Sequence, residues 1–150
     1  MKYLLGPETS LAREGDPDVA TLDGIMAAFY DVICGPADQP RDWDRDRKLY
    51  APQCVLVATG LKDGKPYTLA MDIDGYRERT EPIFKATGFY EYETERMTKS
   101  FGNVTHVFSR YEGKHTPDGP IVVSGVNSIQ LVYTGNRWWI ASVAWDNTAK

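Results

Sequence analysis

The chain has 150 residues, of which 42% are hydrophobic and 25% are charged, values typical of a single globular domain. The formal net charge is −4, and the 17 lysines and arginines are scattered along the chain without forming a basic stripe. Nucleic acids and anionic membranes are therefore poor candidates for partners.

Cysteine content and hydropathy favour a reducing, cytoplasmic setting. Cys34 and Cys54 do not have the spacing of a disulfide framework or a metal knuckle. The apolar stretch near the amino terminus is interrupted by Gly6 and Pro7, so it is too short for a signal peptide. No run approaches the roughly 18 apolar residues of a membrane-spanning helix.

Residues 1–20 have little periodicity, and we expect an amino-terminal arm followed by one domain over residues 21–150. From Thr21, a plausible N-cap, apolar side chains recur at steps of three and four over residues 22–33, which predicts an amphipathic helix. Gly35 and Pro36 end it. Tyr30 flanks the apolar stripe, so its hydroxyl could reach a cavity while its ring is buried.

A second, shorter helix is expected over residues 40–50, capped by Asp42 and stopped by Pro52. Trp43 and Arg47 share one side of it. The alternating charges of residues 41–48 are typical of a solvated helix face. Residues 54–59 form a short strand, and a turn at residues 62–65 leads into another.

Asp72 can cap a third helix that ends at Gly88, although Pro82 removes one hydrogen bond and should kink or shorten it. Beyond Gly88 the period becomes two. Residues 90–101 and 104–111 form strands joined at Gly102, and residues 126–133 and 138–145 form a second hairpin around Gly135.

Helices that precede a run of hairpins indicate an α+β fold, in which a curved antiparallel sheet carries the helices on one face. We expect a small-molecule pocket at the mouth of that sheet. The apolar hairpin of residues 126–145 cannot be stable alone, so the helices must pack against it.

Several short motifs resemble the nuclear transport factor 2-like superfamily over most of residues 21–147. They comprise residues 41–44 (RDWD), 49–52 (LYAP), 101–103 (FGN), 106–109 (HVFS), 125–130 (GVNSIQ), 137–140 (RWWI) and 145–146 (WD). This fold is shared by ketosteroid isomerases, scytalone dehydratase and polyketide cyclases of the SnoaL type. The closest likeness is to small bacterial members without an assigned reaction. The resemblance implies a cone-shaped sheet with N-terminal helices on its concave face, but fold alone does not give a function.

The enzymes of this superfamily provide only a partial template for catalytic residues. The resemblance to ketosteroid isomerases would place a carboxylate near the end of the first strand, but residues 55–59 contain no acid. Scytalone dehydratase is closer, since Tyr30, His106 and Asn127 are similar residue types in similar elements. That enzyme also needs a second interior histidine, whereas His115 lies in a polar loop.

His106 could act as a general base in a pocket, because the pKa of imidazole is near neutrality. The alternative is a half-buried histidine paired across strands on the other face. Asp146 falls on the face of Trp138 and Ile140 if no bulge intervenes, and could then serve as an acid or base at an apolar mouth. Its alternative is a surface carboxylate at the strand end.

Asn127 lies on an apolar face, where it could orient a ligand carbonyl or satisfy a neighbouring backbone group. We expect Trp43, Arg47 and Tyr76 to rim the pocket, with Arg47 binding a ligand carboxylate or forming a surface ion pair. The acidic row at residues 91, 93 and 95 is typical of a solvated strand face. No metal or cofactor is expected.

Two functions are compatible with these features. The first is a cofactor-independent lyase, isomerase or cyclase that acts on a small apolar carbonyl compound by general acid–base catalysis. The second is a non-catalytic ligand-binding or dimerisation module. In either case an aromatic-rich sheet face favours a homodimer.

Overall fold

The computed structural model describes residues 4–6 and 9–147, so residues 1–3 and 7–8 of the predicted arm lie outside it. The described residues form four helices and six strands in this order: α1 (Pro17–Ala20), α2 (Leu22–Asp31), α3 (Trp43–Arg47), β1 (Tyr50–Lys62), β2 (Lys65–Met71), α4 (Ile73–Thr87), β3 (Tyr90–Phe101), β4 (Val104–Lys114), β5 (Ile121–Tyr133) and β6 (Trp138–Asn147). None of the described helices combines the length and apolarity needed to cross a membrane. A cytoplasmic location stays a prediction.

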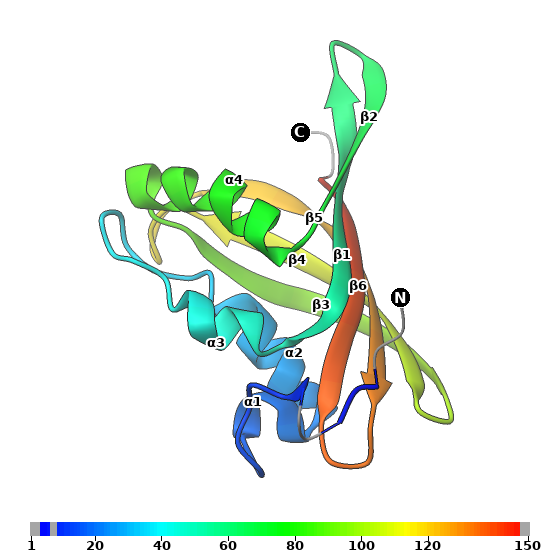
Figure 1. Cartoon of the computed structure of the whole chain (residues 1–150). Helices are drawn as coiled ribbons and strands as arrows, with labels where there is room; N and C mark the ends of the chain where they lie inside the picture. Colours follow the sequence, from blue (N-terminus) through cyan, green and yellow to red (C-terminus); the bar gives the residue numbers. More distant parts are fainter. Residues whose placement is uncertain (1–3, 7–8, 148–150) are drawn as a thin grey trace.

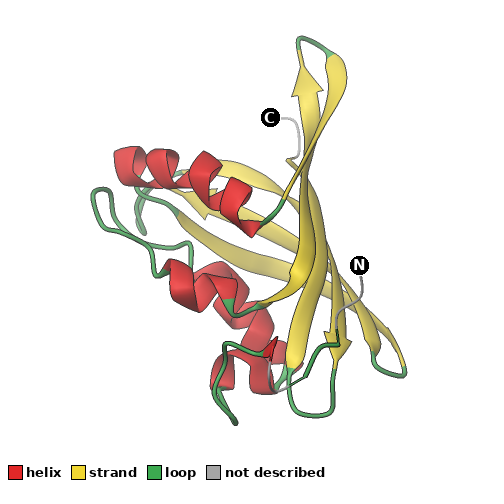
Figure 2. Cartoon of the chain, in the orientation of Figure 1, coloured by secondary structure: helices red, strands yellow, loops and turns green. Residues whose placement is uncertain are grey.

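One six-stranded sheet forms a curved wall in the order β2-β1-β6-β5-β4-β3. Neighbouring strands are antiparallel except β1 and β6, which run parallel. Helices α2, α3 and α4 lie on the concave side of this wall, and the end of the β1–β2 hairpin projects beyond it (Figures 1 and 2). The predicted α+β architecture with helices on the concave face is confirmed.

The three predicted N-caps are present because a short polar side chain precedes each helix. Thr21 accepts a hydrogen bond from the Gly24 amide at 2.9 Å, Asp42 from Arg45 at 3.0 Å, and Asp72 from Gly75 at 2.8 Å. The second helix is shorter than predicted, since Tyr50 already begins β1. Pro52 does not stop that strand, because β1 has no ladder partner between Tyr50 and Val55.

Helix α4 continues through Pro82 to Thr87, so the proline does not shorten it as predicted. Pro82 and Glu78 are both exposed, and water can therefore satisfy the Glu78 carbonyl that loses its intrahelical donor. Gly88 has a φ of 68° and ends the helix, as expected.

Two β-bulges decide which side chains face the helices. In β3, Glu93 pairs with Tyr111 but Glu95 pairs with Arg110, which leaves Thr94 as the extra residue. In β6, Ala141 is the extra residue, because Ser142 and Ile140 pair with consecutive residues of β5. Beyond each bulge, the side chains that a regular strand would turn toward the helices face outward instead, and those that it would turn outward face the helices.

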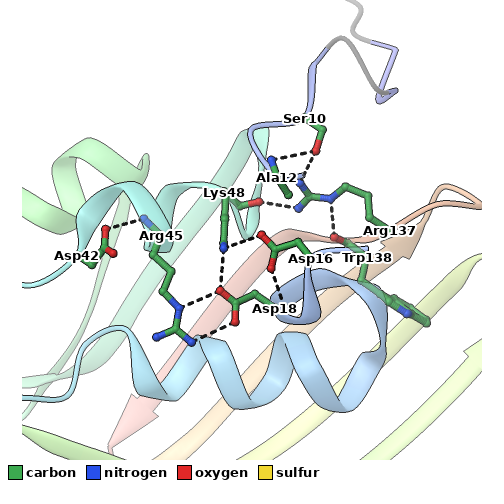
Figure 3. Close-up of polar contacts among 9 residues, drawn as sticks. All are labelled: Ser10, Ala12, Asp16, Asp18, Asp42, Arg45, Lys48, Arg137 and Trp138. Atoms are coloured by element: carbon green, nitrogen blue, oxygen red, sulfur yellow. Dashed lines mark hydrogen bonds and ion pairs between the residues drawn. The ribbon is translucent and has the colours of Figure 1, made fainter. Parts of the chain in front are cut away.

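The segment before α2 is attached to the body by ion pairs (Figure 3). Lys48 Nζ lies 2.8 Å from a carboxylate oxygen of both Asp16 and Asp18, and Arg45 Nε lies 2.8 Å from Asp18. Arg137 donates to the Ser10 hydroxyl at 2.7 Å and to the Lys48 carbonyl at 2.6 Å. We call Asp16, Asp18, Arg45 and Lys48 the ion cluster.

Candidate active site

A cavity of about 370 Å³ lies between α4 and the concave face of the sheet. Most of its wall is apolar and includes Phe29, Ile33, Leu56, Phe84, Phe89, Val143 and Trp145. Its polar wall residues include Tyr50, Tyr76, Arg79, Glu91, Tyr111, Asn127 and Asn147. An apolar cavity with a few convergent polar groups is typical of a small-molecule site.

Glu91 is the carboxyl group of this wall. It lies on the inner face of β3, since its cross-strand partner is the buried Gly113. In the described part of the chain its side chain forms no ion pair or hydrogen bond, and burial raises its pKa from 4.5 to about 8. The interpretation of the acidic row as a solvated face was therefore wrong for Glu91. It holds for Glu95, which the Thr94 bulge turns outward.

Tyrosines surround the space in front of Glu91. The Tyr111 hydroxyl donates a hydrogen bond to Oδ1 of Asn147, and the ring of Tyr76 lies edge-on to Trp145 with centroids 6.0 Å apart. The pKa of Tyr76 is raised by burial, then by the charges of Asp46 and Glu91. A phenol has a single O–H, and that of Tyr111 is already donated to Asn147, so Tyr76, which stays protonated near neutrality, is the phenol that can donate to a ligand oxygen.

Asn127 connects the cavity to a buried polar chain. Its Nδ2 donates to the Tyr30 hydroxyl at 3.1 Å, and that hydroxyl lies 2.6 Å from Ser109 Oγ. Ser109 in turn donates to Glu93, which forms an ion pair with Arg96 at 2.8 Å. Tyr30 and Asn127 are thus brought together as a contact between α2 and β5, with Asn127 in the cavity wall and Tyr30 behind it.

A second carboxyl group is buried behind Tyr50. Asp46 is only 1% exposed, and neither carboxylate oxygen meets hydrogen-bond geometry with a described residue. Burial raises its pKa from 3.8 to about 7, although the Tyr50 hydroxyl and the Arg47 charge stabilise the carboxylate somewhat. The alternating-charge interpretation of this helix did not single out Asp46, because five helical residues do not fix which one turns inward.

The remaining candidates lie outside the cavity. Trp43 is buried beside it and donates to Glu81 at 3.1 Å, whereas Arg47 forms an ion pair with Asp74 near the surface. His106 lies on the outer sheet face, where Nε2 is 3.0 Å from Ser128 Oγ. Asp146 is exposed on that same face, because the Ala141 bulge turns Trp145 and not Asp146 inward.

Neither cysteine is among the described residues that line the cavity. Cys34 and Cys54 are free thiols, and burial raises the pKa of both, to about 12 for Cys54. Within residues 4–6 and 9–147, no three histidine, cysteine or acidic side chains are grouped closely enough to hold a metal ion.

Comparisons with solved structures identify the fold. The chain is similar to a nuclear transport factor 2-like protein from Methylobacillus flagellatus (TM-score 0.53, 13% identity, 86% of this chain and 95% of that one). It also resembles a protein of unknown function with a cystatin-like fold from Nostoc punctiforme (0.62, 10%, 83% and 86%). A third similar structure is a provisionally named ketosteroid isomerase from Shewanella frigidimarina (0.51, 15%, 81% and 92%).

No protein-family model and no curated protein sequence matches the chain. The structural similarity therefore defines the class: this is an α+β protein with the cystatin-like, nuclear transport factor 2-like fold. At these identities the similarity concerns the fold, and the activity must be argued from the site.

Proposed function

We propose that the cavity binds a small, largely apolar carbonyl compound and catalyses proton transfer at the carbon next to the carbonyl group. One observation carries this proposal: Glu91 places a carboxyl group without an ion pair or side-chain hydrogen bond to a described residue in a mostly apolar wall. A carboxyl group with a pKa near 8 is a far stronger base than an ordinary glutamate, and its strength suits weakly acidic carbon–hydrogen bonds. The similarity to a provisionally named ketosteroid isomerase is compatible with this chemistry.

The proposed step uses Glu91 as the base and a phenol as the hydrogen-bond donor. The ionised Glu91 carboxylate takes the proton from the α-carbon. The electron pair of the broken C–H bond forms a C=C bond to the carbonyl carbon, and the π pair of the carbonyl group moves to its oxygen. The resulting enolate oxygen accepts a hydrogen bond from Tyr76, which lines the cavity. Glu91 then returns the proton to the same carbon, which gives exchange, or to a conjugated carbon, which gives isomerisation.

Deuterium exchange tests this step without knowledge of the natural substrate. Neutral aryl ketones such as propiophenone and 1-tetralone are incubated with the protein in D₂O at pH 8, and proton NMR follows the loss of the α-proton signal. We expect catalysed exchange, and we expect Glu91→Gln to slow it by about 100-fold or more, as for loss of a general base.

Matched variants separate the role of Glu91 from a general effect of charge. Glu95→Gln makes the same change on the outward-facing side of the same strand and should leave exchange unchanged. His106→Ala should do the same, because His106 lies on the outer face. Exchange that survives in Glu91→Gln would disprove the catalytic assignment, and ketones that bind without exchange would favour a non-catalytic binding module.

The outer sheet face supports a second proposal, a homodimer. Met97, Phe101, Val104 and Phe108 lie on the outward side of β3 and β4, and their exposed fractions are 67%, 90%, 51% and 45%. An apolar patch of this kind on one sheet face favours pairing with a second copy. Light scattering at micromolar concentration should give twice the mass of the chain, and Phe108→Glu should return it to the monomer value. A monomeric wild-type protein would overturn this proposal.

A further inference from the structure

We propose that the ligand of this cavity carries a carboxylate, which Arg79 binds at the cavity opening while the carbonyl group meets the interior donors. This inference rests on the proposed function and narrows its substrate class from an apolar carbonyl compound to an apolar oxo acid. Arg79 is exposed and also belongs to the cavity wall, so it lies where the cavity meets solvent.

Arg79 differs from the other arginines of the described helices and strands in having no partner. On α4 itself, Arg77 and Lys85 lie 3.8 and 3.9 Å from Glu81. The arginines of α3, β3 and β4 also form ion pairs, with Asp18, Asp31, Asp74, Glu93, Asp23 and Glu95. Arg79 alone among them, within the part of the chain that the structure describes, leaves its guanidinium available to an external anion.

The charge of the wall also favours an anion. Among the described lining residues, Arg79 is the one lysine or arginine and therefore supplies a permanent positive charge. Glu91 is largely protonated below its pKa of about 8, so it does not repel an anion at pH 6.5. His115 Nδ1 must donate to the Gly88 carbonyl at 3.2 Å, because a carbonyl only accepts, and this leaves Nε2 for a ligand.

The opening and the interior of the cavity offer different groups to the two ends of a ligand. A planar guanidinium binds a carboxylate with two parallel hydrogen bonds, and the interior offers apolar walls with phenol and carboxyl donors for a carbonyl oxygen. An amphipathic acid with an aromatic or aliphatic ring, a ketone and a terminal carboxylate satisfies both ends. A wholly apolar ligand would leave Arg79 unpaired.

Matched pairs of ligands test the inference. Calorimetry at pH 6.5 compares 4-oxo-4-phenylbutanoate and 5-oxo-5-phenylpentanoate with their nearly isosteric carboxamides. We expect at least one acid to bind about three- to tenfold more tightly than its amide, the range of a partly exposed, charge-assisted contact. The preference should shrink in 0.5 M NaCl, because screening weakens exposed charge pairs.

Arg79→Gln should remove the preference for the acid and leave the affinity for the amide unchanged. Arg77→Gln is the matched control, since Arg77 is also exposed on α4 but does not line the cavity. Equal affinities for acid and amide in the wild type, or equal losses in Arg77→Gln and Arg79→Gln, would overturn the inference. In that case, deuterium exchange of neutral ketones would leave the proposed function standing. If neither ligand class binds and no exchange occurs, both proposals fail.

Discussion

The pKa values of carboxyl side chains are shifted in opposite directions in the ion cluster and around the cavity. In the cluster, Arg45 lowers the pKa of Asp18 to about 2, and Lys48 contributes further hydrogen bonding and charge. In and behind the cavity wall, burial raises the pKa of Glu91 to about 8 and, despite the opposing effects of Tyr50 and Arg47, that of Asp46 to about 7. The two regions differ in partners as well as in depth, so the carboxylates of the cluster stay ionised, whereas the carboxyl groups in and behind the cavity wall are partly protonated near neutrality.

Helix α3 contains both behaviours within one turn. Arg45 and Arg47, and Lys48 directly after the helix, each form an ion pair with an aspartate outside α3. Asp46 is instead buried, and neither of its carboxylate oxygens meets hydrogen-bond geometry with a described residue. A buried carboxyl group that lacks partners opposes folding once it ionises, and natural proteins tend to keep such groups where function requires them. The predictions below test this contrast.

The largest expected effect is on the pH dependence of stability. The pKa of Asp46 is higher in the folded state, about 7 against 3.8, so the folded state binds more protons and stability falls as pH rises from about 4 to about 7. At about 1.4 kcal/mol per pH unit, the loss approaches roughly 4 kcal/mol. The free energy of unfolding of Asp46→Asn, measured with urea, should therefore rise by about that much relative to wild type between pH 4 and pH 8.

Asp44→Asn is the control for that experiment, because Asp44 is exposed on the same helix. It should follow the wild-type pH dependence throughout. If Asp46→Asn and wild type lose stability in parallel between pH 4 and pH 8, Asp46 is not the buried acid that the structure indicates.

The ion cluster should show the opposite sign. The pKa of Asp18 is lower in the folded state, about 2 against 3.8, so its contribution is present above pH 4 and is lost as pH falls toward 2. Because Arg45 is one-third exposed, we discount the value for screening and expect Asp18→Asn to cost about 1 to 2 kcal/mol at pH 7. Unfolding curves of the two proteins should converge at pH 2, and a constant difference would contradict the assignment.

The third prediction concerns the rate of ketone exchange. Only the ionised Glu91 carboxylate accepts a proton, and with a pKa of about 8 roughly a tenth of it is ionised at pH 7. The exchange rate should therefore rise with pH, pass its midpoint near 8, and gain about tenfold over its value at pH 7. A rate already constant above pH 5 would point to an ordinary carboxylate and remove the contrast with the cluster.

Local sequence signals were sufficient for most of the fold. Caps at Thr21, Asp42 and Asp72 and the end of α4 at Gly88 depend on hydrogen bonds and dihedral angles within a few residues, so they could be predicted. The strand at residues 90–101 was predicted with its observed bounds. The nuclear transport factor 2-like resemblance gave the same architecture that the solved structures show.

The site could not be predicted to the same extent, because it depends on strand register. Single extra residues at Thr94 and Ala141 decide that Glu91 and Trp145 face the cavity and that Glu95 and Asp146 do not. Nothing in an alternating strand marks where such a residue falls. Of the candidates, Tyr76 and Asn127 line the cavity, while Glu91 and Arg79 were not selected.

The smallest expected effect is that of Glu95→Gln, which compares an exposed and a buried glutamate on the same strand, β3. Glu95 lies four residues from Glu91, but its side chain is 70% exposed and its ion pair with Arg110 is 3.4 Å long. Because an exposed pair is screened by water and salt, Glu95→Gln should change the free energy of unfolding by less than about 0.5 kcal/mol, with no trend between pH 6 and pH 9. The free energy of unfolding of Glu91→Gln should instead rise relative to wild type from pH 6 to pH 9, since the substitution abolishes the ionisation of a buried carboxyl group. Equal behaviour of the two variants would mean that the bulge does not separate them.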